Sequence, residues 1–315
     1  MGLSFPGGRR FAFTIMDDTD VATLANVRPV YELLGKLGFR TTKTVWPVGC
    51  PEGSPNFRDS DTLEDPAYLR FVLELQSRGF EIAYHGATME SSDRARTEAA
   101  FTRFRELFGG PPRVYANHAY NRENLYWGVE RLDDPLLRIL YGRIDRQPRG
   151  YYQGHIPDSP WWWGDLAGRM TYVRNLTFSD ANVLRTNPSM PYRDPRRPLV
   201  PWWFSAADAE DVDAFNRLIS PEAQDRLEHE GGVCIVATHL GKRFTSSGAV
   251  NSETRRLLER LSKMPGWFVP VGELLDWLRD RREGPPELPA AEWRRMQWRW
   301  AWDLVARFWL RRRAR

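Results

Sequence analysis

Three of the five histidines in this chain stand at the ends of short apolar runs that are typical of β-strands. They are His85, His118 and His239. A single histidine in such a place is more often structural than catalytic. Three of them, on strands whose carboxyl ends meet at one edge of a parallel α/β fold, indicate a shared site. Imidazole is a common metal ligand and exchanges protons near neutral pH, so metal binding and acid–base catalysis are the chemistries to expect.

A group of carboxylates follows a fourth apolar run. Residues 11–16 lead directly into Asp17, Asp18 and Asp20. Three carboxylates in four residues repel one another, and a bound cation or a proton would compensate that repulsion. The same residues would also suit a helix N-cap with an acidic first turn. The cluster alone favours neither interpretation, but together with the three histidines it favours a functional site.

The elements that would position these side chains alternate along the chain. Strand-like runs cover residues 11–16, 40–48, 81–85, 113–118, 233–240 and 267–271. Helix-like segments cover residues 28–37, 66–78, 92–108, 253–263 and 272–282. This alternation predicts an α/β domain with a largely parallel sheet or barrel. Residues 148–201 are rich in aromatic residues, Pro and Gly, so we expect long ordered loops there, with two strands around residues 170–178 and a role in the substrate site.

Composition places the chain among globular proteins. It has 315 residues, of which 42% are apolar and 27% charged, and only two cysteines. A disulfide framework is therefore excluded, no apolar run reaches the roughly 20 residues that span a bilayer, and no signal peptide is recognisable. We expect a cytoplasmic protein.

The net charge of +4 is concentrated at one end of the chain. Residues 292–315 carry eight Arg against two acidic residues, and five of the 14 Trp, so the rest of the chain is slightly acidic. We expect a catalytic domain over residues 1–282, then a linker and a basic, Trp-rich amphipathic helix over residues 283–315. Basic and Trp residues on one helix suit the surface of an anionic membrane, whereas the alternative is a helix docked on the domain. Nucleic-acid binding is not expected, because the remaining chain is not basic.

The order of these motifs resembles the polysaccharide deacetylase superfamily, the NodB-homology or carbohydrate esterase family 4 group. Residues 13–19 resemble its first motif, an apolar strand ending in Thr-Phe-Asp-Asp-Gly, and residues 37–46 resemble its second strand. Residues 81–85 resemble Glu-Ile-Gly-Asn-His, and residues 237–239 resemble the last motif, Leu-x-His. The resemblance covers about residues 8–281 and implies a distorted (β/α) barrel that hydrolyses the amide of an amino sugar with a bound metal.

The resemblance also implies roles for single residues. Asp17 would be the general base and His239 the general acid, while Asp18 and His85 would hold the metal. The position of the family's second metal histidine is occupied by Met89, and a thioether is a poor zinc ligand at such a site. We therefore expect His118 to complete a three-ligand site for a divalent metal, with Zn²⁺ preferred. Asp20 is the next candidate ligand, and a metal-free site comes third.

Substrate-binding candidates lie near these motifs. They are Asp20, Arg94, Asn117, Asn121, Glu123, Trp163, Asp165 and Arg174. Guanidinium groups suit phosphate or uronate groups, and a Trp face suits a sugar ring. We expect an N-deacylase of an amino sugar in a nucleotide- or lipid-linked precursor of a bacterial surface glycan such as O-antigen or capsule, working in the cytoplasm or peripherally at the inner face of the membrane. The alternatives are an N-acyl (formyl or acetyl) transferase or amidase that uses the same site, and a catalytically inactive sugar-binding protein.

Overall fold

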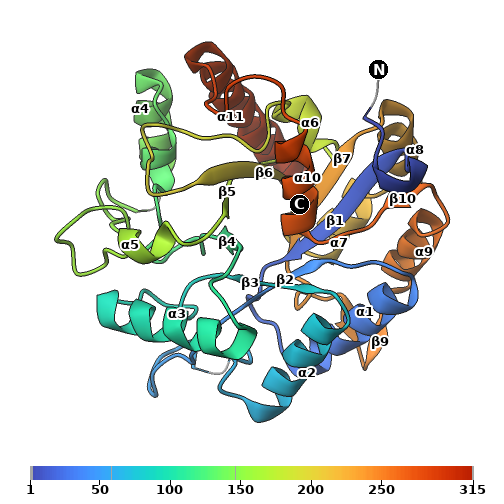
Figure 1. Ribbon diagram of the computed structural model, residues 1–315, viewed down its shortest axis with the longest axis horizontal. Helices are drawn as coiled ribbons and strands as arrows, with labels where there is room; N and C mark the ends of the chain where they lie inside the picture. Colours follow the sequence, from blue (N-terminus) through green and yellow to red (C-terminus); the bar gives the residue numbers. More distant parts are fainter. Residues whose placement is uncertain (1–2, 58, 146, 314–315) are drawn as a thin grey trace.

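A closed barrel of parallel strands forms the centre of the molecule (Figure 1). The structure, a computed structural model, describes residues 3–57, 59–145 and 147–313, and its side chains up to Arg307. Within these residues the barrel strands are β1 (Phe11–Asp17), β2 (Thr42–Val45), β3 (Glu81–Tyr84), β4 (Val114–Ala116), β5 (Tyr172–Phe178), β6 (Trp202–Ala209) and β7 (Val233–Thr238). Neighbours in this order pair in parallel, and β7 pairs with β1 to close the barrel. The predicted distorted (β/α) barrel is therefore confirmed.

Helices surround the barrel. They are α1 (Leu24–Lys36), α2 (Pro66–Ser77), α3 (Arg94–Phe108), α4 (Pro135–Ile144), α5 (Gly164–Ala167), α6 (Val183–Thr186), α7 (Val212–Leu218), α8 (Pro221–Glu230), α9 (Ser252–Leu261), α10 (Val271–Asp280) and α11 (Ala290–Arg313). Short elements complete the fold. They are the 3₁₀-helices η1 (Pro6–Gly8) and η2 (Gly128–Arg131), strand β10 (Gly266–Trp267) beside β1, and the two-stranded ribbon of β8 (Thr245–Ser246) and β9 (Ala249–Val250). Local sequence sets the helix ends: the Asp93 side chain caps α3, and Gly109, at φ 78°, ends it.

Side chains on β1 alternate between two environments. Phe11, Phe13 and Ile15 pack into the layer between the strands and the helices, whereas Ala12 and Met16 pack inside the barrel. Successive side chains of a strand point to opposite faces. The adjacent residues Asp17 and Asp18 must therefore serve different sides of the barrel wall.

The central part of the chain departs from the sequence prediction in two ways. Residues 170–178 contribute one strand, β5, where two were expected. Residues 202–209, which the sequence analysis did not recognise as a strand, form β6 in the barrel wall. The bulky start of β6 hid its strand character, and Trp203 in fact packs in the core with 1% of its surface exposed.

Helix α11 docks on the barrel beside α4 (Figure 1). Trp293, Met296 and Trp300 are buried in the main core cluster. The Trp298 indole donates a hydrogen bond to Asp134, the N-cap of α4, at 3.0 Å. None of the helices in the described ranges is both long and apolar enough to cross a membrane. The side chains of the predicted polybasic end, residues 311–315, lie outside the described residues.

Candidate active site

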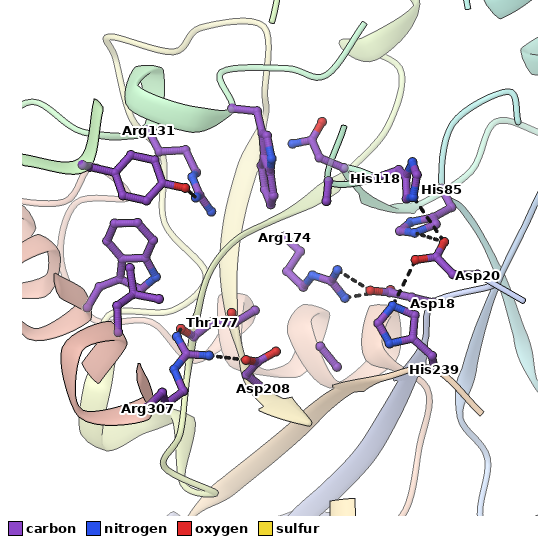
Figure 2. Close-up of a pocket in the computed structure, with 17 residues that line it drawn as sticks. Asp18, Asp20, His85, His118, Arg131, Arg174, Thr177, Asp208, His239 and Arg307 are labelled. Carbon is purple, nitrogen blue, oxygen red and sulfur yellow. Dashed lines mark hydrogen bonds and ion pairs between the residues drawn. The ribbon is translucent and has the colours of Figure 1, made fainter. Parts of the chain in front are cut away.

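A pocket of about 410 Å³ opens at the carboxyl ends of the barrel strands (Figure 2). Its lining includes Asp18 after β1, His85 after β3, His118 after β4, Arg174 on β5 and His239 after β7. Each of these positions continues the inward-facing alternation of its strand, which carries the side chain into the barrel mouth. The structure thus brings together side chains that are up to 221 residues apart in sequence.

The three histidines each hold their Nδ1 atom against an oxygen. His85 Nδ1 lies 2.9 Å from the carbonyl oxygen of Ala116, and His239 Nδ1 lies 2.8 Å from that of Glu210. His118 Nδ1 lies 2.9 Å from Asn121 Oδ1. A carbonyl oxygen only accepts hydrogen bonds, so Nδ1 carries the proton in each ring. In the neutral form, the lone pair of every Nε2 atom then faces the pocket.

All three Nε2 atoms converge on one carboxylate, that of Asp20. Asp20 Oδ1 lies 3.3 Å from His85 Nε2 and 3.6 Å from His118 Nε2, and Asp20 Oδ2 lies 3.1 Å from His239 Nε2. Burial would raise the pKa of Asp20, but the surrounding histidines hold it well below its usual value. Lone pairs that face a carboxylate repel it unless a proton or a cation lies between them. Figure 2 shows this convergence at one end of the pocket.

Among the described residues, no group of three or more His, Cys, Asp and Glu side chains is arranged so that it could hold a metal ion as it stands. Asp20, His85 and His118 nevertheless supply donor types that a divalent metal accepts. Asp20 Oδ1 lies 3.3 and 3.6 Å from the two Nε2 atoms, and a tetrahedral ion with bonds of about 2.0–2.1 Å keeps its ligand atoms about 3.3 Å apart. In addition, Asp20 Oδ1 and His85 Nε2 are buried and make no hydrogen bond. Such orphaned buried atoms need a partner, and a cation would supply it.

Asp18 is engaged differently. Its two oxygens accept hydrogen bonds from the Arg174 guanidinium at 2.8 and 2.6 Å, and both side chains are only 7% exposed. Burial would raise the pKa of Asp18, but the Arg174 charge and nearby His85 hold it below its usual value. Arg174 already engages both oxygens of Asp18, whereas Asp20 Oδ1 has no hydrogen-bond partner. The geometry therefore favours Asp20 over Asp18 as the carboxylate ligand.

Asp17 lies on the other side of the barrel wall. It accepts hydrogen bonds from Lys43 Nζ and from the Tyr31 hydroxyl, both at 2.9 Å, and from the Leu240 backbone N–H. Burial would lower the pKa of Lys43, but Asp17 holds it above its usual value. Asp17 is not among the described residues that line the pocket. This placement gives Asp17 a structural ion pair, whereas its neighbour Asp18 lines the pocket.

Hydrogen bonds outside the pocket hold His118 in place. Asn121 Nδ2 donates to the backbone oxygens of Thr88 and Glu90 and to Glu123 Oε1, all at 3.0 Å, which fixes Asn121 Oδ1 toward His118. Burial raises the pKa of Glu123 to about 7. Asn121 and Glu123 thus support His118 and do not line the pocket, whereas Asn117 lines it.

Several predicted substrate residues lie elsewhere. The Arg94 guanidinium makes a bidentate ion pair with Asp165 and lies 5.2 Å from the Trp162 ring centroid, outside the described pocket lining. Trp163 is fully buried and donates a hydrogen bond from its indole to the Glu123 backbone oxygen. These residues stabilise the loop around α5. Met89 also stands outside the described pocket lining.

The sequence analysis missed the other end of the pocket. Asp208 comes from the end of β6, Arg131 from η2, and Trp300 and Arg307 from α11. Asp208 could have been recognised as a polar residue near the end of a strand, had β6 been recognised. The position of α11 over the barrel mouth depends on tertiary packing, which no local sequence pattern predicts.

The fold of this protein is similar to that of several solved structures. The structure superimposes on one from Mycobacterium smegmatis assigned as a polysaccharide deacetylase, with a TM-score of 0.53 and 13% identity over 91% of this chain and 96% of that one. Puue allantoinase gives a TM-score of 0.52 and 13% identity, over 90% and 95% of the two chains. A Pseudomonas aeruginosa PAO1 structure assigned as a polysaccharide deacetylase gives 0.52 and 12%, over 90% and 96%.

No family model and no curated protein matches the sequence. The likeness is therefore one of fold, and it agrees with the NodB-homology fold that the motifs indicate.

Proposed function

We propose that this protein is a metal-dependent N-deacylase of an amino sugar in a nucleotide- or lipid-linked precursor of a surface glycan. The observation that carries the proposal is the convergence of three Nε2 atoms on Asp20 beside the buried Asp18–Arg174 pair. Asp20, His85 and His118 would hold the ion. When bound, a divalent cation would lower the pKa of a water molecule and stabilise negative charge that develops on the amide oxygen.

The remaining side chains supply proton transfer. Asp18 is ionised, buried and faces the pocket, so it would accept the proton of the attacking water. Arg174 fixes the orientation of Asp18 through two hydrogen bonds. His239 would donate a proton to the departing amine from Nε2. Burial would lower the pKa of His239, but the hydrogen bond to Asp20 holds it above its usual value, which favours the protonated form.

Metal analysis of purified variants tests the ligand assignment. Asp20→Asn, His85→Ala and His118→Ala should each lose the bound ion, whereas Asp18→Asn should retain it. His229, an exposed residue on α8, provides a matched control, and His229→Ala should bind metal like the parent protein. Metal loss in Asp18→Asn with retention in Asp20→Asn would contradict the assignment.

Product analysis separates hydrolysis from the alternatives. An N-acetylated or N-formylated sugar phosphate should release free acetate or formate and a free amine. Transfer would instead leave the acyl group on a second amine. An inactive binding protein would bind the sugar without any turnover in the metal-loaded form, and either result would replace the hydrolase proposal.

A further inference from the structure

An apolar groove adjoins the pocket at the end opposite Asp20. It has a volume of about 720 Å³ and lies between α4 and α11. Its walls include the apolar side chains Leu132, Leu137, Leu140, Ile144, Trp302 and Val305, together with side chains shared with the pocket. Ile144 is 70% exposed and Trp302 is 68% exposed. Apolar side chains this exposed, and gathered in one groove, mark a binding surface more often than a free one.

The groove and the pocket share part of their lining. Tyr141, Trp300 and Leu304 line both cavities, which places the groove directly beside the pocket. Figure 2 shows Arg131 at the end of the pocket away from His85 and Asp20. The catalytic end is rich in charge and the groove is apolar, which suits a ligand with a polar head and a hydrocarbon chain.

A buried cation lies at the junction. Arg131 is 7% exposed, and its guanidinium lies 4.1 Å from the ring centroid of Trp127 and 4.9 Å from that of Trp300. Its hydrogen bonds go to the Gly128 carbonyl and the Tyr141 hydroxyl. No described carboxylate forms an ion pair with it, whereas neighbouring Arg307 pairs with Asp208 and Asp303. A buried guanidinium without a counter-ion favours an anionic group in the adjacent space.

We propose that the substrate is a glycosyl phosphate that carries a long hydrocarbon chain. The N-acyl group would lie at Asp20 and His118, the phosphate at Arg131, and the chain in the groove between α4 and α11. This inference rests on the proposed function for the reaction, but it selects a lipid-linked substrate over a nucleotide-linked one. A nucleotide base would place hydrogen-bonding groups against side chains that are almost entirely apolar.

Calorimetric titration with alkyl phosphates, below their micellar concentrations and without membranes, tests the binding mode. Affinity should rise about fourfold for each methylene that enters the groove, from octyl to decyl to dodecyl phosphate. Octanol should bind more weakly than octyl phosphate, because it lacks the charge that pairs with Arg131. Equal affinity for all chain lengths, or for the alcohol and the phosphate, would overturn the proposal.

Matched variants separate the groove from general apolar adhesion. The double variant Leu140→Gln/Val305→Gln changes two exposed groove residues and should lose the dependence on chain length. Leu136→Gln/Ile139→Gln changes two residues of α4 that are also exposed but do not line the groove, and should retain it. Equal loss in both double variants would point to a lipid surface in place of a single bound chain and would contradict the proposal.

Turnover distinguishes this inference from the proposed function. An N-acylated hexosamine 1-phosphate with a decyl chain should be hydrolysed with a lower KM than the same compound without the chain. Equal KM values with normal acyl release would overturn the groove assignment and leave the deacylase intact. Chain-dependent binding of alkyl phosphates without acyl release from either compound would refute the deacylase and leave the groove.

Discussion

The two adjacent aspartates allow a direct test of which one takes part in catalysis. Replacing Arg174 with Met leaves the buried Asp18 carboxylate without its partner, and breaking one side of a buried pair costs about 3–5 kcal/mol. Asp18 then keeps its burial and the nearby His85 and His239 but loses its strongest partner, so its pKa rises above its value in the parent protein. For every unit by which that pKa exceeds the assay pH, the ionised fraction falls about tenfold.

The effect has a defined pH dependence. In the parent protein the pKa of Asp18 is lowered by folding, so the pair stabilises the protein above the unfolded value of 3.8 and loses this contribution as the pH falls through the folded pKa. In Arg174→Met the folded pKa is higher than in the parent protein, so less of this stabilisation remains at neutral pH. The stability difference measured by urea denaturation should therefore grow between pH 4 and pH 7.

Activity provides the second measurement. The acid limb of the profile of kcat/KM against pH, measured by acyl release, should move to higher pH in Arg174→Met. Lys43→Met is the matched control, because it removes the partner of Asp17 from an equally buried pair. It should lose similar stability without moving the acid limb. A shift in Lys43→Met and none in Arg174→Met would refute the assignment of Asp18 as the base.

Three further predictions concern the surroundings of the site. Asn121→Ala removes the acceptor of the His118 Nδ1 proton, and the affinity for the metal, measured by competition with a chelator, should fall about 10–100-fold. Trp293→Ala should cost about 3–5 kcal/mol in urea denaturation, because this α11 side chain is 2% exposed in the core. Burial lowers the pKa of His155 to about 4, and its Nδ1 accepts the Tyr126 N–H, so stability should be complete above pH 6.5 and fall progressively as the pH drops from 6.5 to about 4. This loss amounts to about 3 kcal/mol and should be absent in His155→Gln.

Each of these predictions would be contradicted by a specific result. Unchanged metal affinity in Asn121→Ala would mean that His118 is not a ligand or needs no support. A loss below about 1 kcal/mol in Trp293→Ala would show that α11 is not part of the cooperative core. The same acid sensitivity in His155→Gln and the parent protein would assign it to other groups.

Polar residues at strand ends could be located from the sequence because they interrupt apolar runs. His85, His118 and His239 stand out in this way, and the structure brings all three to one pocket. The barrel itself follows from the alternation of strands and helices. Both predictions rest on local sequence patterns, and the folded chain contains the elements that those patterns indicate.

The separate roles of Asp17, Asp18 and Asp20 could not be predicted from the sequence in the same way. Three acidic residues within four positions match a Thr-Phe-Asp-Asp-Gly motif in more than one alignment, and the phase of the strand decides which carboxylate faces inward. That phase is visible only in the packing of Met16 inside the barrel and of Ile15 outside it. The contribution of Arg131 and α11 to the pocket was missed because their approach to it depends on contacts between distant segments.

The pairing of Asp17 with Lys43 and of Asp18 with Arg174 also bears on how β1 finds its register. A slip of one residue would turn each aspartate to the opposite face of the barrel wall. Lys43 and Arg174 lie on different strands and serve different faces, so after such a slip one aspartate would take the other's place beside one cation, while the second cation would stay buried without its carboxylate. Asp17 and Asp18 repel each other at the end of β1, but their separate partners raise the free energy of any fold in which β1 is shifted in register. The ion pairs on the two faces of the barrel wall therefore help to specify the register of β1, the strand that carries Asp18 into the pocket.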